Sequence, residues 1–167
     1  MKKNVFVTGS LAYDHISNFH DKFSNHILPN KIHVLNVSFT TSNLKKQFGG
    51  TATNIAYNLK MLGLEPNIFS AAGKDFAEYQ AWLNKHRIKT NYITKVKDDF
   101  TAVANIITDE DDNQINSFYS GALGKKRPSI KTALKKEKPV LGIISPDNPV
   151  MMISYAQDFT FAKLPFI

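Results

Sequence analysis

The stretch Gly49-Gly50-Thr51-Ala52-Thr53-Asn54 opens the most regular pattern in this sequence. Beyond the two glycines, apolar side chains recur at helical spacing and share one face: Ala52, Ile55, Ala56, Leu59 and Leu62. Gly63 follows at the position where a helix commonly ends. The spacing predicts a helix over residues 51–62 that begins directly after a pair of glycines.

The glycine pair has two interpretations. Two glycines before a helix expose backbone N–H groups at the positive end of that helix, and they let a ligand approach the main chain. Asn54 lies one turn into the helix, where its amide can both donate and accept hydrogen bonds. The alternative is a glycine-rich turn in which Thr51 or Thr53 caps the helix. No Gly-Lys-Ser/Thr follows the pair, so it is not a P-loop, and Gly9 lacks the further glycines of a dinucleotide-binding turn.

Apolar runs on both sides of this helix predict an α/β fold. Residues 4–7 are typical of a buried strand that ends at Thr8-Gly9-Ser10, and residues 67–73 and 140–146 are typical of further core strands. Helices are predicted over residues 75–87 and from Asn148-Pro149 onward. This alternation indicates a parallel sheet covered by helices. The apolar end, residues 164–167, has the pattern of a chain entering another strand.

Two segments depart from this alternation and predict a small separate sheet. In the first, Val34–Thr40 is rich in β-branched residues and predicts a half-exposed antiparallel strand. In the second, residues 101–108 and 114–119 predict a hairpin around the acidic turn 109–113. That turn imitates the start of a calcium loop, but Gln114 and Ser120 stand where such a loop requires Gly and Glu. A solvated turn without metal is therefore expected.

Composition excludes several classes of protein. With 167 residues, 43% of them apolar, the chain suffices for one globular domain. It contains no cysteine, which excludes disulfides and thiolate chemistry. No apolar window approaches the roughly 18 residues of a membrane span, and no signal peptide is evident, so a cytoplasmic protein without membrane contact is expected. The histidines show no metal-ligand spacing.

The positive charge is concentrated in one place. The formal net charge is +7, and residues 125–138 hold seven basic residues and one acidic residue, which gives +6 for that run and +1 for the remainder. A short helix starting at Pro128-Ser129 with a solvated basic face explains the run. Contact with phosphate groups is the alternative. No aromatic residues interleave with the basic ones, so nucleic acid is not an expected partner.

Two further positions are candidates for ligand contact. Asp14 lies four residues past Ser10, where a carboxylate can accept hydrogen bonds from vicinal hydroxyls of a sugar; capping a turn is the alternative role. Phe118 and Tyr119 are neighbours on a predicted strand and face opposite ways. We expect one ring to lie over a ligand and the other to enter the core.

Taken in order, these motifs resemble those of the PfkB (ribokinase-like) carbohydrate kinases: Val7-Thr8-Gly9-Ser10 with Asp14, Gly49-Gly50 with Asn54-Ile55-Ala56 and Leu62-Gly63, and Ala72-Gly73-Lys74-Asp75-Phe76. Within that family the sequence is similar to bacterial adenosine kinases through Phe23 to Pro29, Thr108-Asp109, Gln114-Ile115, Ser117-Phe118-Tyr119 and Gly121-Ala122. The resemblance covers most of residues 4–148. It implies a Rossmann-like parallel sheet flanked by helices, with a small β-sheet lid built from residues of about 13–48 and 98–120. Residues 1–167 would form the amino-terminal part of one such domain.

The resemblance also implies roles for individual residues. Asp14 would hold the ribose hydroxyls, Gly49 and Gly50 would admit the sugar, and Asn54 would complete its hydrogen bonding. Further nucleoside contacts are implied for three residues: Ser10, Ser38 and Phe118, the last as an aromatic wall against the purine. Ala104 departs from the pattern, because the resembling kinases carry an aromatic residue there that would sandwich the base.

The implied activity is ATP- and Mg²⁺-dependent phosphorylation of a nucleoside or sugar hydroxyl, with adenosine to AMP as the leading reaction. In these kinases the ATP site, the anion hole and the catalytic base lie downstream of the position matching Ile167, so we expect this chain to hold the substrate-binding half and no catalytic residue. The alternative is an inactive remnant that binds a sugar or nucleoside, or that serves as an interaction module. A homodimer joined through the lids is a further expectation.

Overall fold

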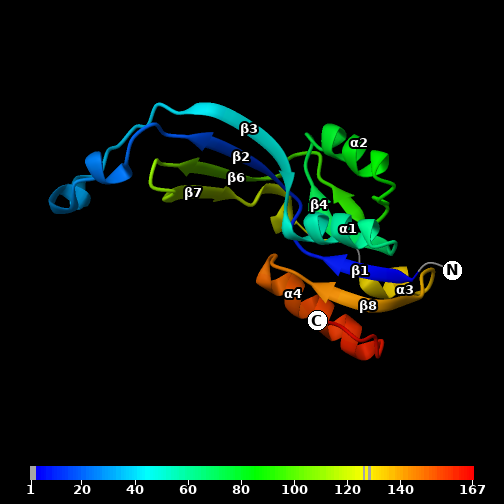
Figure 1. The fold of residues 1–167 in the computed structure, drawn as a ribbon. Coiled ribbons are helices and arrows are strands. Elements are labelled where there is room, and N and C mark those ends of the chain that lie inside the picture. Colours follow the sequence, from blue (N-terminus) through cyan, green and yellow to red (C-terminus); the bar gives the residue numbers. More distant parts are fainter. Residues whose placement is uncertain (1–2, 126, 128) are drawn as a thin grey trace.

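A four-stranded parallel sheet forms the centre of the molecule, in the strand order β5-β4-β1-β8 (Figure 1). The computed structural model describes residues 3–125, 127 and 129–167. The strands are β1 (Asn4–Thr8), β4 (Glu65–Ala72), β5 (Ile93–Lys95) and β8 (Pro139–Ile144). The structure confirms the three core strands predicted from apolar runs and adds β5 at one edge.

Helices cover both faces of this sheet (Figure 1). Side chains alternate along each strand, so Val7 and Ile68 face one layer while Phe6 and Phe69 face the other. The first layer holds α1 (Thr51–Met61) and α2 (Ala77–Lys85), and the second holds α3 (Ile130–Leu134) and α4 (Pro149–Phe161). The predicted helix-covered parallel sheet is confirmed.

A second four-stranded sheet projects from one side of this core, in the order β3-β2-β6-β7 (Figure 1). Its strands are β2 (Ala12–Asn18), β3 (Ser42–Gly49), β6 (Ala102–Thr108) and β7 (Gln114–Tyr119). β6 and β7 form the predicted antiparallel hairpin. At the root of the sheet, where β2 begins and β3 ends, the rings of Tyr13 and Phe48 pack against Tyr79 of α2 at centroid distances of 5.5 and 4.6 Å. Aromatic packing on one face thus fixes the second sheet to the core.

Residues 34–40 do not form the predicted strand. The segment between β2 and β3 contains two short 3-10 helices, η1 (Phe23–Asn25) and η2 (Pro29–Val34), followed by irregular chain. Val34 and Leu35 are 75% and 55% exposed. The prediction was wrong because a β-branched stretch forms a strand only where a neighbouring strand offers a pairing edge. Both edges of β2 are already paired, one with β3 and the other with β6.

The end of the chain runs beside β8. Phe166 pairs in parallel with Gly142, and the Ile144 N–H donates to the Ile167 carbonyl at 2.8 Å. This confirms that residues 164–167 enter a strand-like conformation.

Helices of the described residues are all too short, or too polar, to cross a lipid bilayer.

Candidate functional site

Hydroxyl groups join β1, β8 and α1 at one point. Ser10 follows β1, and its hydroxyl accepts a hydrogen bond from the Thr51 backbone N–H at 2.9 Å. The Thr51 hydroxyl donates to the Pro146 carbonyl at 2.9 Å and lies 3.0 Å from the hydroxyl of Ser145. These bonds hold two strand ends against the start of α1. They also correct the capping alternative, because Ser10, and neither Thr51 nor Thr53, accepts from a free N–H of the helix start.

The glycine pair between β3 and α1 lies in close contact with its surroundings. A side chain at Gly49 would place its Cβ 2.1 Å from the Asp14 Oδ2 atom. Gly50 has φ of +89°, and a Cβ there would lie 2.6 Å from the Ser10 carbonyl oxygen and 2.7 Å from the Ala12 nitrogen. Both positions therefore require glycine, and Gly49 lets the Asp14 carboxylate lie directly against the main chain.

Asp14 is a half-buried carboxylate within β2. Among the residues that the structure describes, none hydrogen-bonds to this carboxylate or pairs with it, which removes the turn-capping alternative. Burial raises the pKa of Asp14, and the neighbouring His15 opposes this with a smaller effect. Polar groups withdrawn from water usually have a partner in folded proteins. The carboxylate is thus available to a ligand that brings hydroxyl donors.

A row of three residues crosses the second sheet from Asp14. The register pairs Asp14 with Ala104 and Ala104 with Phe118, so these three side chains point to the same face. Neighbouring strands lie about 4.8 Å apart, which places Phe118 roughly 10 Å from Asp14 along the row. The single methyl group of Ala104 leaves the space between them open.

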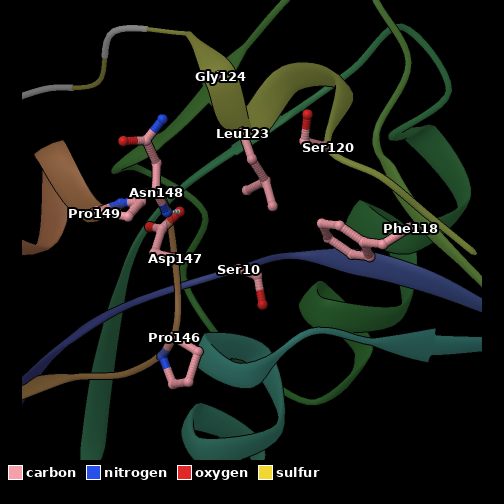
Figure 2. A pocket seen from close by; sticks show the side chains of 9 residues that line it. All are labelled: Ser10, Phe118, Ser120, Leu123, Gly124, Pro146, Asp147, Asn148 and Pro149. Atoms are coloured by element: carbon pink, nitrogen blue, oxygen red, sulfur yellow. Dashed lines mark hydrogen bonds between the residues drawn. The ribbon is translucent and has the colours of Figure 1, made fainter.

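A cavity of about 520 Å³ opens between this face of the second sheet and the loop that joins β8 to α4. Phe118 and Leu123 line it on one side, Pro146 and Asp147 on the other, and Ser10 lies between them (Figure 2). Leu123 belongs to the 3-10 helix η3 (Gly121–Gly124). Largely apolar walls with a few polar groups suit a planar ring that carries a few hydrogen-bonding atoms.

Neither of the two adjacent aromatic residues of β7 enters the core. Phe118 lines the cavity and is 60% exposed. Tyr119 is 49% exposed, and its hydroxyl donates to Asp99 at 2.5 Å, so the prediction that one of the two rings enters the core is not met. That part of the prediction was wrong because β7 is an edge strand that is exposed on both faces.

Asn54 lies near the junction of the two sheets, and Ser38 lies away from it. Asn54 is in the first turn of α1, where its N–H donates to the Gly50 carbonyl at 3.1 Å and its side chain is exposed. Ser38 is exposed and precedes Phe39, whose ring packs on Phe19 and Phe23 beyond the end of β2. The structure therefore gathers Ser10, Asp14, Gly49, Gly50 and Phe118 around the junction of the two sheets, with Asn54 one helical turn away, and leaves Ser38 apart.

A buried ion pair beside the cavity was missed by the sequence analysis. The Arg127 guanidinium donates to both carboxylate oxygens of Asp147 and to the Leu123 carbonyl, and both charged side chains are fully buried. The pair joins η3 to the β8–α4 loop, and so it holds two walls of the cavity together. The expected solvated face is wrong for Arg127, which lies 20 residues from its partner, a separation that no local pattern reveals. Exposure is confirmed for the lysines of that run other than Lys126, which lies outside the described residues.

The acidic turn of the second sheet is built on a buried residue. Asp109 accepts hydrogen bonds from the backbone N–H groups of Phe23, Asp111 and Asn113 at 3.0, 3.0 and 2.8 Å. Burial raises the pKa of Asp109, but these hydrogen bonds outweigh it and hold the pKa below its usual value. The expected solvated turn is therefore corrected at this position. Within the described residues, no three His, Asp or Glu side chains are grouped as a metal site requires.

Comparison with known proteins identifies the family of this chain. Residues 2–141 match the family described as pfkB family carbohydrate kinase. The chain belongs to the pfkB family. The nucleoside kinase of Methanothermobacter thermautotrophicus is 32% identical over 122 residues, which make up 72% of this chain and 36% of that protein.

Solved structures of two nucleoside kinases extend the similarity. The structure of Burkholderia thailandensis nucleoside kinase in complex with inosine superposes with a TM-score of 0.82 at 30% identity, over 98% of this chain and 51% of that one. The nucleoside kinase of Methanocaldococcus jannaschii gives a TM-score of 0.75 at 25% identity, over 93% of this chain and 48% of that one. These similarities confirm the ribokinase-like α/β fold and the family. The chain spans about half the length of these structures.

Proposed function

We propose that this chain forms the nucleoside-binding half of a pfkB-family kinase that transfers the γ-phosphate of ATP to the 5'-hydroxyl of a nucleoside. Adenosine is the leading substrate and inosine the first alternative. The observation that carries the proposal is the half-buried carboxylate of Asp14, which lies against Gly49 and has no partner among the described residues. Relatives that are nucleoside kinases support it, one of them solved with inosine.

The ribose would bind at the junction of the two sheets. An ionised carboxylate only accepts hydrogen bonds, and its two oxygens can take the protons of two vicinal hydroxyls. Asp14 would therefore hold the ribose 2'- and 3'-hydroxyls. Gly49 and Gly50 would let the sugar ring reach the main chain, and Asn54 would add its amide from the first turn of α1.

The base would extend from Asp14 toward Phe118. Because Ala104 lies between them on the same face, the base has room to pass over its methyl group. Contact with the Phe118 ring would contribute about 0.5–1.5 kcal/mol beyond the burial of apolar area. The cavity walls at Leu123 and Pro146 would exclude water from the remaining side of the base.

Kinases of this family use ATP and Mg²⁺, which supply the phosphoryl group and stabilise its charge. Among the described residues no group of three or more His, Asp or Glu side chains could hold a metal ion by itself, and a magnesium ion beside a nucleotide takes one or two carboxylates together with the phosphates. Following the family resemblance, we place the nucleotide and the catalytic base in the part of the relatives that this chain does not match. The residues present here would orient the 5'-hydroxyl by fixing the ribose, and the second sheet would shield it from water.

Calorimetric titration of the 167-residue chain with adenosine, inosine and ribose tests the proposal. We expect binding of adenosine or inosine, and we expect Asp14→Ala to weaken it by the ~1–3 kcal/mol that an unpaired polar group costs. Asp111→Ala is the matched control, since Asp111 is a half-exposed aspartate of the second sheet that pairs with Lys22. Absence of nucleoside binding, or equal affinity in Asp14→Ala and the unmodified chain, would contradict the assignment.

A further inference from the structure

The peptide plane between Gly49 and Gly50 is flanked on both sides by residues without a Cβ, so little steric hindrance opposes its reorientation. Rotation of a peptide plane changes ψ of the residue before it and φ of the residue after it, and here both angles belong to glycine. This is the single Gly-Gly pair in the sequence. The same peptide borders Asp14, because Gly49 contacts the carboxylate and Gly50 contacts the backbone of Ser10 and Ala12. Its orientation therefore decides which backbone group the ligand meets.

Two buried hydroxyls fix the carbonyl of this peptide. The Tyr79 hydroxyl donates to the Gly49 carbonyl at 2.6 Å and lies 2.7 Å from the Thr53 hydroxyl. The Thr53 hydroxyl lies 2.5 Å from the same carbonyl oxygen and 3.0 Å from the Gly50 carbonyl oxygen. Tyr79 is 0% exposed and Thr53 is 1% exposed. Water does not compete for these bonds, so they keep their full orienting effect.

The orientation places the Gly50 N–H on the side of Asp14. Tyr13 and Asp14 are adjacent in β2 and point to opposite faces of the second sheet. Tyr79 packs on the Tyr13 ring at 5.5 Å, so the Gly49 carbonyl that it binds points to the Tyr13 face. The peptide is trans, and its N–H points opposite to its carbonyl. A flipped peptide would instead direct a carbonyl dipole toward the carboxylate.

We propose that the Tyr79 hydroxyl, together with Thr53, holds the Gly49–Gly50 peptide with its N–H on the Asp14 face and thereby sets the affinity for the nucleoside. This inference rests on the proposed function. Tyr79 is a positioning residue, because it acts through the glycine pair from the opposite face of the sheet. In the unbound protein the same hydroxyl keeps the carbonyl oxygen away from Asp14.

Tyr79→Phe tests this, because it removes the hydroxyl and keeps the ring. Tyr13→Phe is the matched control: Tyr13 is 1% exposed, packs in the same cluster, and its hydroxyl donates to the Asp75 carbonyl at 3.0 Å, away from the glycine pair. Each variant loses one tyrosine-to-carbonyl bond, so both should unfold at a similar, slightly lower urea concentration. We expect inosine and adenosine affinity to fall about 10-fold in Tyr79→Phe and to change less than about twofold in Tyr13→Phe.

Thr53→Val provides a second, independent variant should Tyr79→Phe fail to fold. Its nucleoside affinity should also fall about 10-fold. The affinity of the Tyr79→Phe/Thr53→Val double variant should fall by less than the product of the two single losses, because both hydroxyls act on one carbonyl. Without any ligand, the backbone amide resonance of Gly50 should shift in Tyr79→Phe and stay in place in Tyr13→Phe. Unchanged affinity in Tyr79→Phe, or equal losses in Tyr79→Phe and Tyr13→Phe, overturns the inference. If the unmodified chain binds no nucleoside, the proposed function itself fails.

Discussion

β4 buries seven of its eight residues, whereas all six residues of β7 are exposed. The two strands belong to different sheets. The parallel sheet lies between two helical layers, so its strands have apolar neighbours on both faces. The second sheet has its core contacts at the root, where aromatic rings pack on one face and Leu123 packs on Ala12 and Ala102 on the other.

This contrast separates stability from ligand contact. The parallel sheet and its helices bury the large side chains that stabilise the fold. The second sheet presents Asp14, Ala104 and Phe118 on a face that the core leaves accessible. Substitutions in the first region should therefore change the free energy of unfolding, and substitutions on that face should change ligand affinity.

The sharpest comparison uses the same substitution in each region. Phe69 is fully buried, with the Phe6 and Tyr92 rings at 4.8 and 4.7 Å, so Phe69→Ala should lower the free energy of unfolding by about 3–5 kcal/mol. Phe118→Ala should lower it by less than about 0.5 kcal/mol, yet weaken nucleoside binding. Urea denaturation and calorimetric titration measure the two effects. Similar destabilisation by both variants would show that the regions are not separate.

Gly49→Ala should lower both the stability of the fold and the affinity for nucleosides, because Gly49 lies where the second sheet joins the core. Its added Cβ would overlap the Asp14 carboxylate, and we expect a loss of about 1–3 kcal/mol in stability together with loss of detectable nucleoside binding. Gly124→Ala is a control for stability, since a Cβ there meets no atom within 4 Å. Normal titration curves for Gly49→Ala would refute the close contact of Asp14 with the main chain.

Asp14→Asn should raise the free energy of unfolding and lower the affinity for nucleosides. The raised pKa of Asp14 means that ionisation of this group costs stability in the folded protein; the cost is absent below the pKa of the unfolded chain, develops as pH rises from there to the folded pKa, and is complete above it. The variant should therefore be slightly more stable than the unmodified chain at neutral pH, and equally stable near about pH 3. It should also bind nucleosides more weakly. Lower stability of the variant at neutral pH would contradict the unpartnered carboxylate.

The smallest effect is expected for the ion pair at the root of the second sheet. Lys46 of β3 and Glu78 of α2 lie 2.8 Å apart, with side chains that are 45% and 66% exposed. Glu78→Gln should change the free energy of unfolding by less than about 0.5 kcal/mol, at low and at high salt alike. A change above about 1 kcal/mol that disappears in salt would indicate that charge, and not aromatic packing, fixes the sheet to α2.

The parts of the fold that burial dictates were predictable from the sequence. Apolar runs predicted β1, β4 and β8, and helical spacing predicted α1, because each has a continuous apolar face. β2 and β3 were not predicted as strands, since polar residues occupy both of their faces: Asp14 and His15 in β2, and Lys45, Lys46 and Gln47 in β3. β3 is exposed on most of its length, and β2, although more buried, carries polar residues on both faces, so neither has an alternating pattern to detect.

In the candidate site, likewise, some residues could be predicted from the sequence and others could not. Asp14, Gly49 and Gly50 carried a signal through their residue types and the family resemblance. Tyr79 carried none, because its spacing with neighbouring apolar residues predicts a core ring, and the direction of a buried hydroxyl depends on packing. The Arg127–Asp147 pair was equally hidden, since one partner lies in a run of exposed lysines.

Two of the crossings between the sheets, at residues 9–12 and 49–51, lie next to Asp14, and the chain crosses again between β5 and β6 and after β7. Any rotation of the second sheet relative to the core would have to bend the backbone at these crossings, and the proposed ribose site lies beside two of them. A small rotation there becomes a long sweep at the far tip, where η1 and η2 lie (Figure 1). A ligand at the proposed ribose site would therefore touch backbone on which the orientation of the whole second sheet depends.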